Sequence, residues 1–402
     1  MRGRARSAVA FVLMLVSMGS PALAADAPGV TSTEIKVGGI FPFSGPASAI
    51  GLVGRGLLGY VQSINDRGGI NGRKINYIAY DDAYSPPKAV EHARKLVESD
   101  GVAFMFSQMG TPGNSATSKY LMSQRVPALG VVTGASKFTN VADFPLTTTS
   151  IVSFDTEGRI YGKFLAKTLP NAKYAILYQN DDLGKDYINA FKSLLKSDFD
   201  KKIVASAYDV SEPTVDSQVL NLKSSGADAL LVAGTPKFSA QAIRKASESG
   251  WKPTIVLNYP SSSVGGTLRP AGLDKSVGVI VGTMLMDPTD PQWDNNEGMK
   301  NYKSFASKYL PGADIADVSY LFGYTQGMLL EHIIKQCGDD LSRENILKQA
   351  KSLKDVVLPT VLPGIKINTS EKLNANFSQM RLQRWTGTHW EQFSEVLDAG
   401  SD

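Results

Sequence analysis

The stretch from Ile35 to Tyr84 constrains the fold more than any other part of the chain. It predicts a strand at Ile35–Phe41, a helix with a broad apolar stripe at Leu52–Asp66, and a second strand at Lys74–Tyr80. The glycine-rich residues 67–72 favour a helix end, because glycine tolerates the left-handed backbone that such an end needs. Two strands joined by a helix form a βαβ unit, which predicts a parallel sheet covered by helices.

Alternating helices and strands continue to the end of the chain. A hydroxyl-rich segment at residues 144–150 separates two runs of such elements, and we expect it to cross between domains. Two successive runs predict an α/β fold with two doubly wound, Rossmann-like lobes. After the opening unit, the expected helices lie at residues 86–99, 114–124, 156–168, 185–195, 216–224, 239–249, 296–308, 318–336 and 343–351, and the expected strands at residues 102–106, 128–132, 174–178, 203–208, 229–232, 254–257, 278–284, 365–368 and 379–385.

The first 24 residues predict an exported protein. Arginines at positions 2, 4 and 6 precede an apolar run at residues 8–18, which is too short to cross a bilayer. Ala22-Leu23-Ala24 supplies the small residues that signal peptidase reads. We therefore expect a signal peptide that is cleaved after Ala24, rather than a membrane anchor, and an exported mature chain.

Length, charge and cysteine content set further limits. The 402 − 24 = 378 residues after the cleavage site exceed what one compact core usually holds, so two domains are expected. The formal net charge falls from +4 to 4 − 3 = +1 when the three arginines are removed. That balance predicts no basic surface for nucleic acid. Cys337 is the one cysteine, so no internal disulfide can form, and we expect a buried, unreactive thiol.

Gly54, Gly56 and Gly59 form a G-x-G-x-x-G pattern, and Asp81 follows at about the spacing of a dinucleotide site. In such a site the glycines occupy the turn directly after a strand, so that a helix N-terminus faces the pyrophosphate. Here twelve residues separate Phe41 from Gly54, and the glycines fall inside the predicted helix. We expect them to allow close helix packing instead of binding a dinucleotide.

The residue types that carry catalysis are poorly represented. His92, His332 and His389 lie far apart, and none has metal-ligand spacing to another. The chain contains no G-x-S-x-G motif for a nucleophilic serine. The acid pairs at residues 81–82 and 181–182 are expected to end loops and cap helices. We therefore expect no enzyme activity, no metal and no cofactor.

Two loops have the composition of a binding site. Residues 107–114 and 132–136 each follow a predicted strand, so both lie at the same edge of the first sheet. Free amides at the helix N-terminus after the first loop would attract a carboxylate, and the Thr111 hydroxyl would add a donor. The alternative is that both are ordinary turns, since Ser, Thr, Asn and Gly are common turn residues. A cleft between the lobes is the expected place for a ligand.

Five motifs follow one another at characteristic spacing. They are Phe43-Ser44-Gly45-Pro46, NDRGGINGRK at residues 65–74, Tyr80-Asp81-Asp82, the loop at residues 110–114 and NDDLGKD at residues 180–186. In order and spacing, these motifs resemble the periplasmic leucine/isoleucine/valine-binding proteins. The resemblance implies a type I periplasmic binding fold, in which three crossings join two lobes, here residues 25–147 with 285–362 and residues 148–284 with 363–402. It also implies a monomeric, periplasmic solute receptor that partners a membrane ABC permease and performs no chemistry.

The resemblance also implies how a ligand is held. Thr111 and the stretch Val132–Ala135 match the positions that bind an amino-acid carboxylate. The acid that meets the ammonium group is missing, because the aligned residues 258–262 read NYPSS. A buried ammonium group without a counter-charge carries a large desolvation cost, so we expect an apolar or aromatic carboxylate as ligand. The expected binding residues are Phe43, Ile50, Tyr84, Met109, Gly110, Thr111, Thr133, Gly134, Ala135, Phe154, Leu183, Thr235, Tyr259 and Ser261.

Other readings stay open at this point. The ligand could be a branched-chain or aromatic amino acid whose ammonium group meets Asp181 or Asp182. The aromatic residues among the expected contacts, and Tyr178, could belong to the core instead of the site, since most aromatics at strand ends pack inward. The same fold could also serve as the ligand-sensing input protein of a signalling system. In each case the expected mechanism is closure of the two lobes around the ligand.

Overall fold

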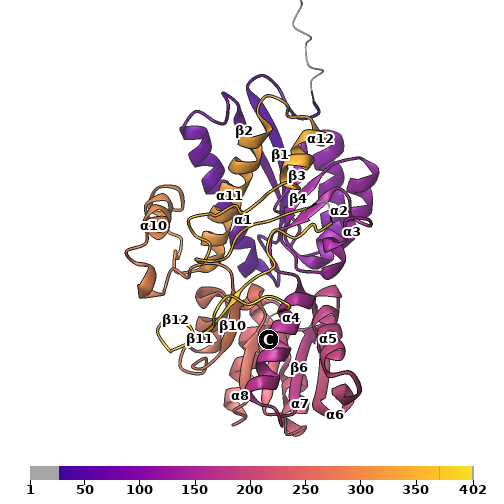
Figure 1. Cartoon of the computed structure of the whole chain (residues 1–402), viewed down its shortest axis with the longest axis vertical. Helices are drawn as coiled ribbons and strands as arrows, with labels where there is room; N and C mark the ends of the chain where they lie inside the picture. Colours follow the sequence, from indigo (N-terminus) through magenta and orange to yellow (C-terminus); the bar gives the residue numbers. More distant parts are fainter. Residues whose placement is uncertain (1–26, 371, 401–402) are drawn as a thin grey trace, which may run out of the picture.

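The computed structural model describes residues 27–370 and 372–400. The predicted signal peptide lies outside these residues. Two α/β lobes lie one above the other along the long axis of the molecule (Figure 1). The predicted fold class is therefore confirmed. Within residues 27–370 and 372–400, the helices are too short or too polar to span a bilayer.

The first lobe is built on a parallel sheet. Helix α1 (Ser48–Asp66) and helix α11 (Val318–Cys337) cover one face, and α2 (Pro86–Arg94) and α3 (Thr111–Ser123) cover the other (Figure 1). Helix α10 (Glu297–Tyr309) packs against α1, and α12 (Arg343–Ala350) packs against α11. Among the described residues, the strand order is β2 (Lys74–Asp81), β1 (Glu34–Phe41), β3 (Phe104–Phe106), β4 (Ala128–Val131), β5 (Thr147–Thr149).

The second lobe repeats this scheme with a larger sheet. Helices α4 (Phe154–Thr168) and α5 (Asp182–Leu195) cover one face, and α7 (Asp216–Ser224) and α8 (Pro236–Glu248) cover the other. The short helices α6 (Phe199–Lys202) and α9 (Arg269–Ala271) lie in connections. Among the described residues, the strand order is β12 (Trp390–Gln392), β11 (Arg381–Trp385), β10 (Ile280–Thr283), β9 (Thr254–Leu257), β8 (Ala229–Ala233), β6 (Tyr174–Gln179), β7 (Ile203–Tyr208). In this order, the pairs β10–β11 and β11–β12 are antiparallel and the other pairs are parallel.

The chain passes between the lobes after β5, after β10 and before β11. These passages lie side by side, since Leu285 forms a bridge with Val361 and Thr149 forms a bridge with Ala375. A hinge made of adjacent passages lets two rigid lobes move relative to each other with few changes elsewhere.

Some elements differ from those that the sequence predicts. The expected strand at residues 365–368 is wrong, because Ile367 makes only an isolated bridge with Val356. Both Ile365 and Ile367 are buried, so the alternating pattern there reflects burial in a connection and not membership of a sheet. Residues 147–149, expected in a domain crossing, form the edge strand β5, and the crossing follows it.

Close packing between α1 and α11 depends on glycine. A Cβ atom on Gly56 would lie 2.3 Å from the Tyr320 carbonyl oxygen, and one on Gly323 would lie 2.1 Å from the Val53 carbonyl oxygen. Gly54 and Gly59 sit in the same helix α1, against ring and side-chain atoms of neighbouring elements. The prediction that the G-x-G-x-x-G glycines serve helix packing is therefore confirmed. Cys337, at the end of α11, is buried as expected.

We predict that Gly323→Ala lowers the free energy of unfolding by about 1–3 kcal/mol, the usual cost of overpacking. Alanine favours a helix by only about 0.5–1 kcal/mol over glycine, so the backbone clash outweighs that gain. Urea unfolding followed by circular dichroism measures the change. Gln62→Ala, on the exposed side of α1, is the control and should leave stability nearly unchanged. Unchanged or higher stability of Gly323→Ala would show that α1 and α11 can shift apart to accommodate the methyl group without a cost in free energy.

Candidate functional site

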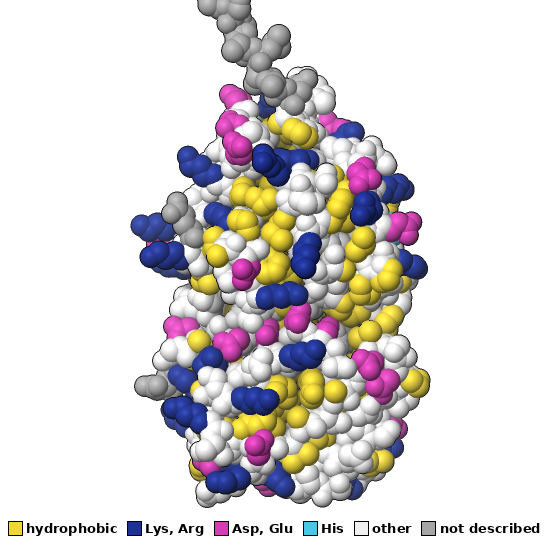
Figure 2. Space-filling view, turned by 90° about the vertical axis from the view of Figure 1, so that its right-hand side faces the viewer, with side chains coloured by type: hydrophobic (Ala, Val, Ile, Leu, Met, Phe, Trp, Pro, Cys, Tyr) yellow, Lys and Arg dark blue, Asp and Glu magenta, His cyan; other side chains and the backbone are white. Residues whose placement is uncertain are grey.

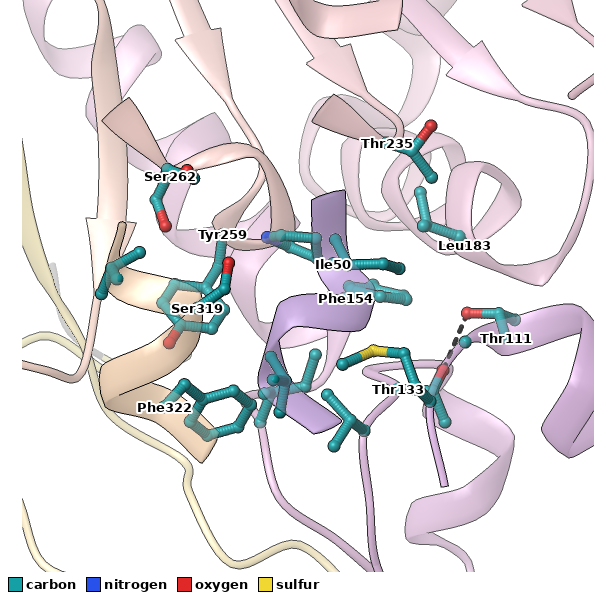
Figure 3. A pocket seen from close by; sticks show the side chains of 18 of the residues that line it. Ile50, Thr111, Thr133, Phe154, Leu183, Thr235, Tyr259, Ser262, Ser319 and Phe322 are labelled. Atoms are coloured by element: carbon teal, nitrogen blue, oxygen red, sulfur yellow. Dashed lines mark hydrogen bonds between the residues drawn. The ribbon is translucent and has the colours of Figure 1, made fainter. Parts of the chain in front are cut away.

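A cavity lies between the two lobes, with a volume of about 600 Å³ including its open mouth. Its walls come from both lobes, mostly from the segments where a strand ends and a helix begins (Figure 3). The lining residues are Ile50, Val53, Tyr84, Met109, Gly110, Thr111, Val132, Thr133, Ile151, Phe154, Leu183, Thr235, Tyr259, Pro260, Ser262, Ser263, Val318, Ser319 and Phe322.

Most of the binding residues that the sequence predicts come together around this one cavity. They derive from loops that are far apart in the chain but lie at the facing edges of the two sheets. Their contact with a ligand stays a prediction. The predicted residues on the cavity wall are Ile50, Tyr84, Met109, Gly110, Thr111, Thr133, Phe154, Leu183, Thr235 and Tyr259.

Phe43 and Ser261 are predicted binding residues that do not line the cavity. The Phe43 ring stacks on Phe41, with 5.4 Å between ring centroids, and the Arg55 guanidinium lies 4.6 Å from the Phe43 centroid. The Ser261 hydroxyl points into the second lobe, where it bonds to the Ser239 hydroxyl at 2.8 Å and to a backbone carbonyl. Its neighbour Ser262 lines the cavity in its place.

Gly134 and Ala135 also lie behind the wall instead of on it. A Cβ atom on Gly134 would lie 2.6 Å from the Phe154 ring, so this glycine leaves room for the ring that lines the cavity. The Ala135 amide donates to the Thr133 hydroxyl at 3.1 Å and fixes the orientation of that side chain. Both residues support cavity residues. Tyr178, the other aromatic candidate, is half-buried and packs outside the cavity wall, against Gly184.

Helix α11 supplies wall residues that sequence reasoning missed. Val318, Ser319 and Phe322 come from its first turns, and Asp317 caps that end. The Asp317 cap marks a helix start in the sequence, but no local signal tells which cavity that start faces. The other missed residues are Val53, Ile151, Pro260, Ser262 and Ser263, whereas Val132, also on the wall, belongs to the predicted stretch Val132–Ala135.

A pair of threonine hydroxyls marks one end of the cavity. Thr111 Oγ1 and Thr133 Oγ1 lie 2.8 Å apart, and Thr133 Oγ1 also accepts the Ala135 amide (Figure 3). The bond between the hydroxyls uses one of their two protons, so the other can be donated to a ligand. Thr111 begins α3, which has no capping side chain. Pro112 has no N–H, so the amides of Thr111 and Gly113 are the donors that remain at this helix start.

Helix starts surround the rest of the cavity. Ile50, Phe154, Leu183 and Val318 lie in the first turns of α1, α4, α5 and α11, and Thr235 precedes α8. Each helix start carries a partial positive charge. None of the described residues that line the cavity has a charged side chain. The wall therefore favours a negative group and offers no direct partner to a positive one.

Asp181 and Asp182, the acids considered for an ammonium group, both have other partners. Asp181 caps α5 through the Leu183 amide and accepts from the Gln179 amide group at 2.6 Å. Asp182 forms an ion pair of 2.7 Å with Lys137 at the rim. Neither side chain lines the cavity.

The lobes touch on both sides of the cavity, so this conformation is closed. On the side of α3 and α5, Asp186 accepts from the Ser136 amide and hydroxyl at 2.7 and 2.8 Å. Figure 2 shows this side, where acidic and basic side chains lie along the line at which the lobes meet. On the other side, the Ser263 hydroxyl donates to Asp317 at 2.7 Å and Arg269 pairs with Asp314 at 2.6 Å.

Comparison with known proteins places these features in a family. Residues 34–389 match the family model described as "Periplasmic binding protein". A Leu/Ile/Val-binding protein homolog 7 from Brucella suis is 28% identical over 252 residues, which make up 60% of this chain and 62% of that protein. The chain therefore matches less than two thirds of this relative's length.

Solved structures share the fold. A branched-chain amino acid ABC transporter protein from Thermus thermophilus with bound valine has a TM-score of 0.82 at 14% identity, covering 92% of this chain and 98% of that one. A fatty acid ABC transporter substrate-binding protein from Thermomonospora curvata has a TM-score of 0.76 at 18% identity, covering 93% and 95%. At such identities the likeness concerns the fold alone.

The buried acids predict an unusual dependence of stability on pH. Burial raises the pKa of Asp82, Asp181 and Asp186 to about 6, and that of Glu157 and Asp287 to about 7. The folded chain then holds protons that the unfolded chain releases near pH 4. The contribution of these acids to the free energy of unfolding is fully present below their pKa in the unfolded chain, and it is lost as pH rises to about 7. We expect the melting temperature to drop by several degrees between pH 5 and pH 8.

Differential scanning calorimetry without ligand measures this drop. Asp186→Asn should reduce it, because Asp186 is mostly buried, whereas Glu297→Gln, at an exposed helix start, should not. A melting temperature that rises from pH 5 to pH 8 would contradict the assignment of these acids as buried groups that form no ion pair.

Proposed function

The chain belongs to the periplasmic binding protein family, and we propose that it is the solute receptor of an ABC importer, which captures a small apolar or aromatic carboxylate by closure of its lobes. The observation that carries this proposal is the cavity wall between the lobes, which is mainly apolar and bears uncharged donors only. The protein binds its ligand and performs no chemistry on it.

The Thr111–Thr133 end suits a carboxylate. One hydroxyl proton and the first amides of α3 converge there, and hydrogen bonds to a charged acceptor are stronger than those between neutral groups. The helix start adds a favourable field for an anion. Beyond this end, Ile50, Phe154 and Leu183 provide an apolar wall for the body of the ligand.

An ammonium group has no partner of opposite charge on the described wall. Burying it there would cost several kcal/mol in desolvation that no contact offsets. An acid without an amino group avoids this cost. The wall therefore supports aromatic and other apolar acids over amino acids.

A branched-chain or aromatic amino acid is the second candidate. The names of the Brucella suis and Thermus thermophilus proteins point to such ligands. In addition, Asp317 lies directly behind Ser263 and Ser319, which line the cavity. An ammonium group at that end would interact with Asp317 through the two serines.

The proposed cycle uses the hinge between the lobes. A ligand first docks on the first lobe through Thr111, and the second lobe then closes with Leu183 and Tyr259. The Ser136–Asp186 and Ser263–Asp317 contacts stabilise the closed form, which a membrane permease would recognise. We place the lobes at residues 25–147 with 285–362 and residues 148–284 with 363–402, except that residues 148–149 belong to β5 of the first sheet, after a signal peptide cleaved behind Ala24. A monomer suffices for this cycle. A ligand-sensing input protein would close in the same way but report to a signalling partner.

We expect 3-phenylpropanoate or benzoate to bind more tightly than leucine in isothermal titration calorimetry. Thr111→Val should weaken binding of these acids about ten- to hundredfold, the loss of one hydrogen bond to a charged group. Ser118→Ala, further along α3 and off the cavity wall, should leave the affinity unchanged. Tight binding of leucine with none of either acid would favour the second candidate instead.

Closure predicts a smaller radius of gyration with saturating 3-phenylpropanoate than without it. Small-angle X-ray scattering measures both states. Thr111→Val at the same ligand concentration should give a value between the two, because fewer molecules are occupied. An equal radius in both states of the unmodified protein would exclude capture by lobe closure.

A further inference from the structure

Glu157 is a buried acid directly behind the cavity wall. It lies one turn after Phe154 in α4, and its side chain is fully buried. Its Oε1 accepts the Tyr259 amide at 2.7 Å and the Tyr161 hydroxyl at 2.6 Å. Phe154 and Tyr259 both line the cavity, so this carboxyl connects two wall residues from different elements.

The other oxygen of this carboxyl is free to take a proton. Oε2 and the Tyr187 hydroxyl are both buried and form no hydrogen bond of good geometry, but the neighbouring Tyr187 hydroxyl still lowers the pKa of Glu157. The titratable groups that face Glu157 are Tyr161 on its own helix, Tyr187 on α5 and Tyr259 after β9. Within the described residues, the influences on Glu157 are burial and these three neighbours, and none is a cation.

We propose that Glu157 couples ligand binding to proton uptake, so that its carboxyl binds one proton from the solvent when a carboxylate enters the cavity. The inference rests on the proposed function, because only an anionic ligand favours uptake of a proton by Glu157. The proton is taken up at Oε2, facing the Tyr187 hydroxyl, while Oε1 keeps both hydrogen bonds. Glu157 is thus a positioning residue for Tyr259 whose charge state also sets the affinity.

The physical basis is repulsion between two negative charges in a site with little water. At an effective dielectric constant near 20, two unit charges within about 10 Å of each other interact by at least roughly 1.5 kcal/mol, which corresponds to about one pKa unit. Burial already raises the pKa of Glu157 to about 7, so little free energy is needed to protonate it at neutral pH. An entering anion raises this pKa further, and a zwitterionic amino acid would not.

The sign of the pH dependence of affinity follows from the repulsion between the ligand anion and ionised Glu157. Below the pKa of the free protein, Glu157 is neutral and affinity does not change with pH. Between that pKa and the higher pKa of the complex, the affinity for an anion falls up to about tenfold per pH unit. A ligand ammonium group would instead favour ionised Glu157, and affinity would rise with pH.

The test measures the Kd of 3-phenylpropanoate by isothermal titration calorimetry from pH 6.0 to 8.5, in buffers of different ionisation enthalpy. In the unmodified protein, we expect Kd to rise about three- to thirtyfold and up to one proton to be taken up per ligand. Glu157→Gln keeps an acceptor for Tyr259 and Tyr161 but cannot ionise. From pH 7.0 to 8.5, above the range in which Asp181 behind Leu183 titrates, its Kd should stay constant, and at pH 8.5 it should be lower than that of the unmodified protein.

Asp287→Asn is the matched control. Asp287 is also a buried acid with a pKa near 7, but its hydrogen bonds go to Thr289, and it is not on the cavity wall. This variant should keep the pH dependence. If Glu157→Gln does not fold, Tyr187→Phe should move the range of falling affinity to higher pH, because the Tyr187 hydroxyl lowers the pKa of Glu157.

The outcomes test the role of Glu157 separately from the proposed function. Binding of 3-phenylpropanoate without a pH dependence, or with one that survives in Glu157→Gln, overturns the role of Glu157 and leaves the proposed function standing. Failure of 3-phenylpropanoate and benzoate to bind at any pH defeats the proposed function, and the role of Glu157 falls with it.

Discussion

The parallel direction of the strands is the constraint on which the site depends. In a parallel sheet every strand ends, and the next helix begins, at the same edge. The two sheets present these edges to each other, so the starts of α1, α3 and α11 from one lobe face those of α4, α5 and α8 from the other. The cavity between them has a favourable potential for an anion without a single lysine or arginine on its described wall.

Much of this arrangement could be predicted from the sequence. The first βαβ unit predicted the fold class, and the resemblance assigned Thr111 and Thr133 to one site, where both line the same cavity. The prediction failed where tertiary packing decides. Ser261 and Ser262 are adjacent serines at the end of a short 3₁₀ turn. The backbone geometry of that turn, and not the residue type, decides that Ser262 lines the cavity and Ser261 does not. Phe322 was missed because α11 reaches the site through its packing on α1 and not through any local motif.

Charge is kept behind the wall and not on it. Asp317 supports Ser263 and Ser319, Asp181 supports Leu183, and Glu157 supports Tyr259. Each acid fixes a wall residue through hydrogen bonds while the wall itself stays neutral. Such an arrangement makes the shape of the cavity rigid, and it keeps each negative charge one residue away from the ligand. The cost is a set of carboxyls held in surroundings that disfavour their ionised form.

The glycine contact between α1 and α11 has a consequence for how the chain reaches its native state. Helix α11 follows the whole parallel part of the second sheet in sequence, yet it completes the core of the first lobe. Strands β6 to β10 and the helices between them follow one another in the chain. The sheet of β1 to β5, by contrast, is covered on one face by α11, which is synthesised only after β10. During vectorial synthesis and export, the second lobe can assemble most of its sheet while the apolar stripe of α1 is still uncovered. Until α11 is synthesised, that stripe lacks the helix that covers it in the folded protein.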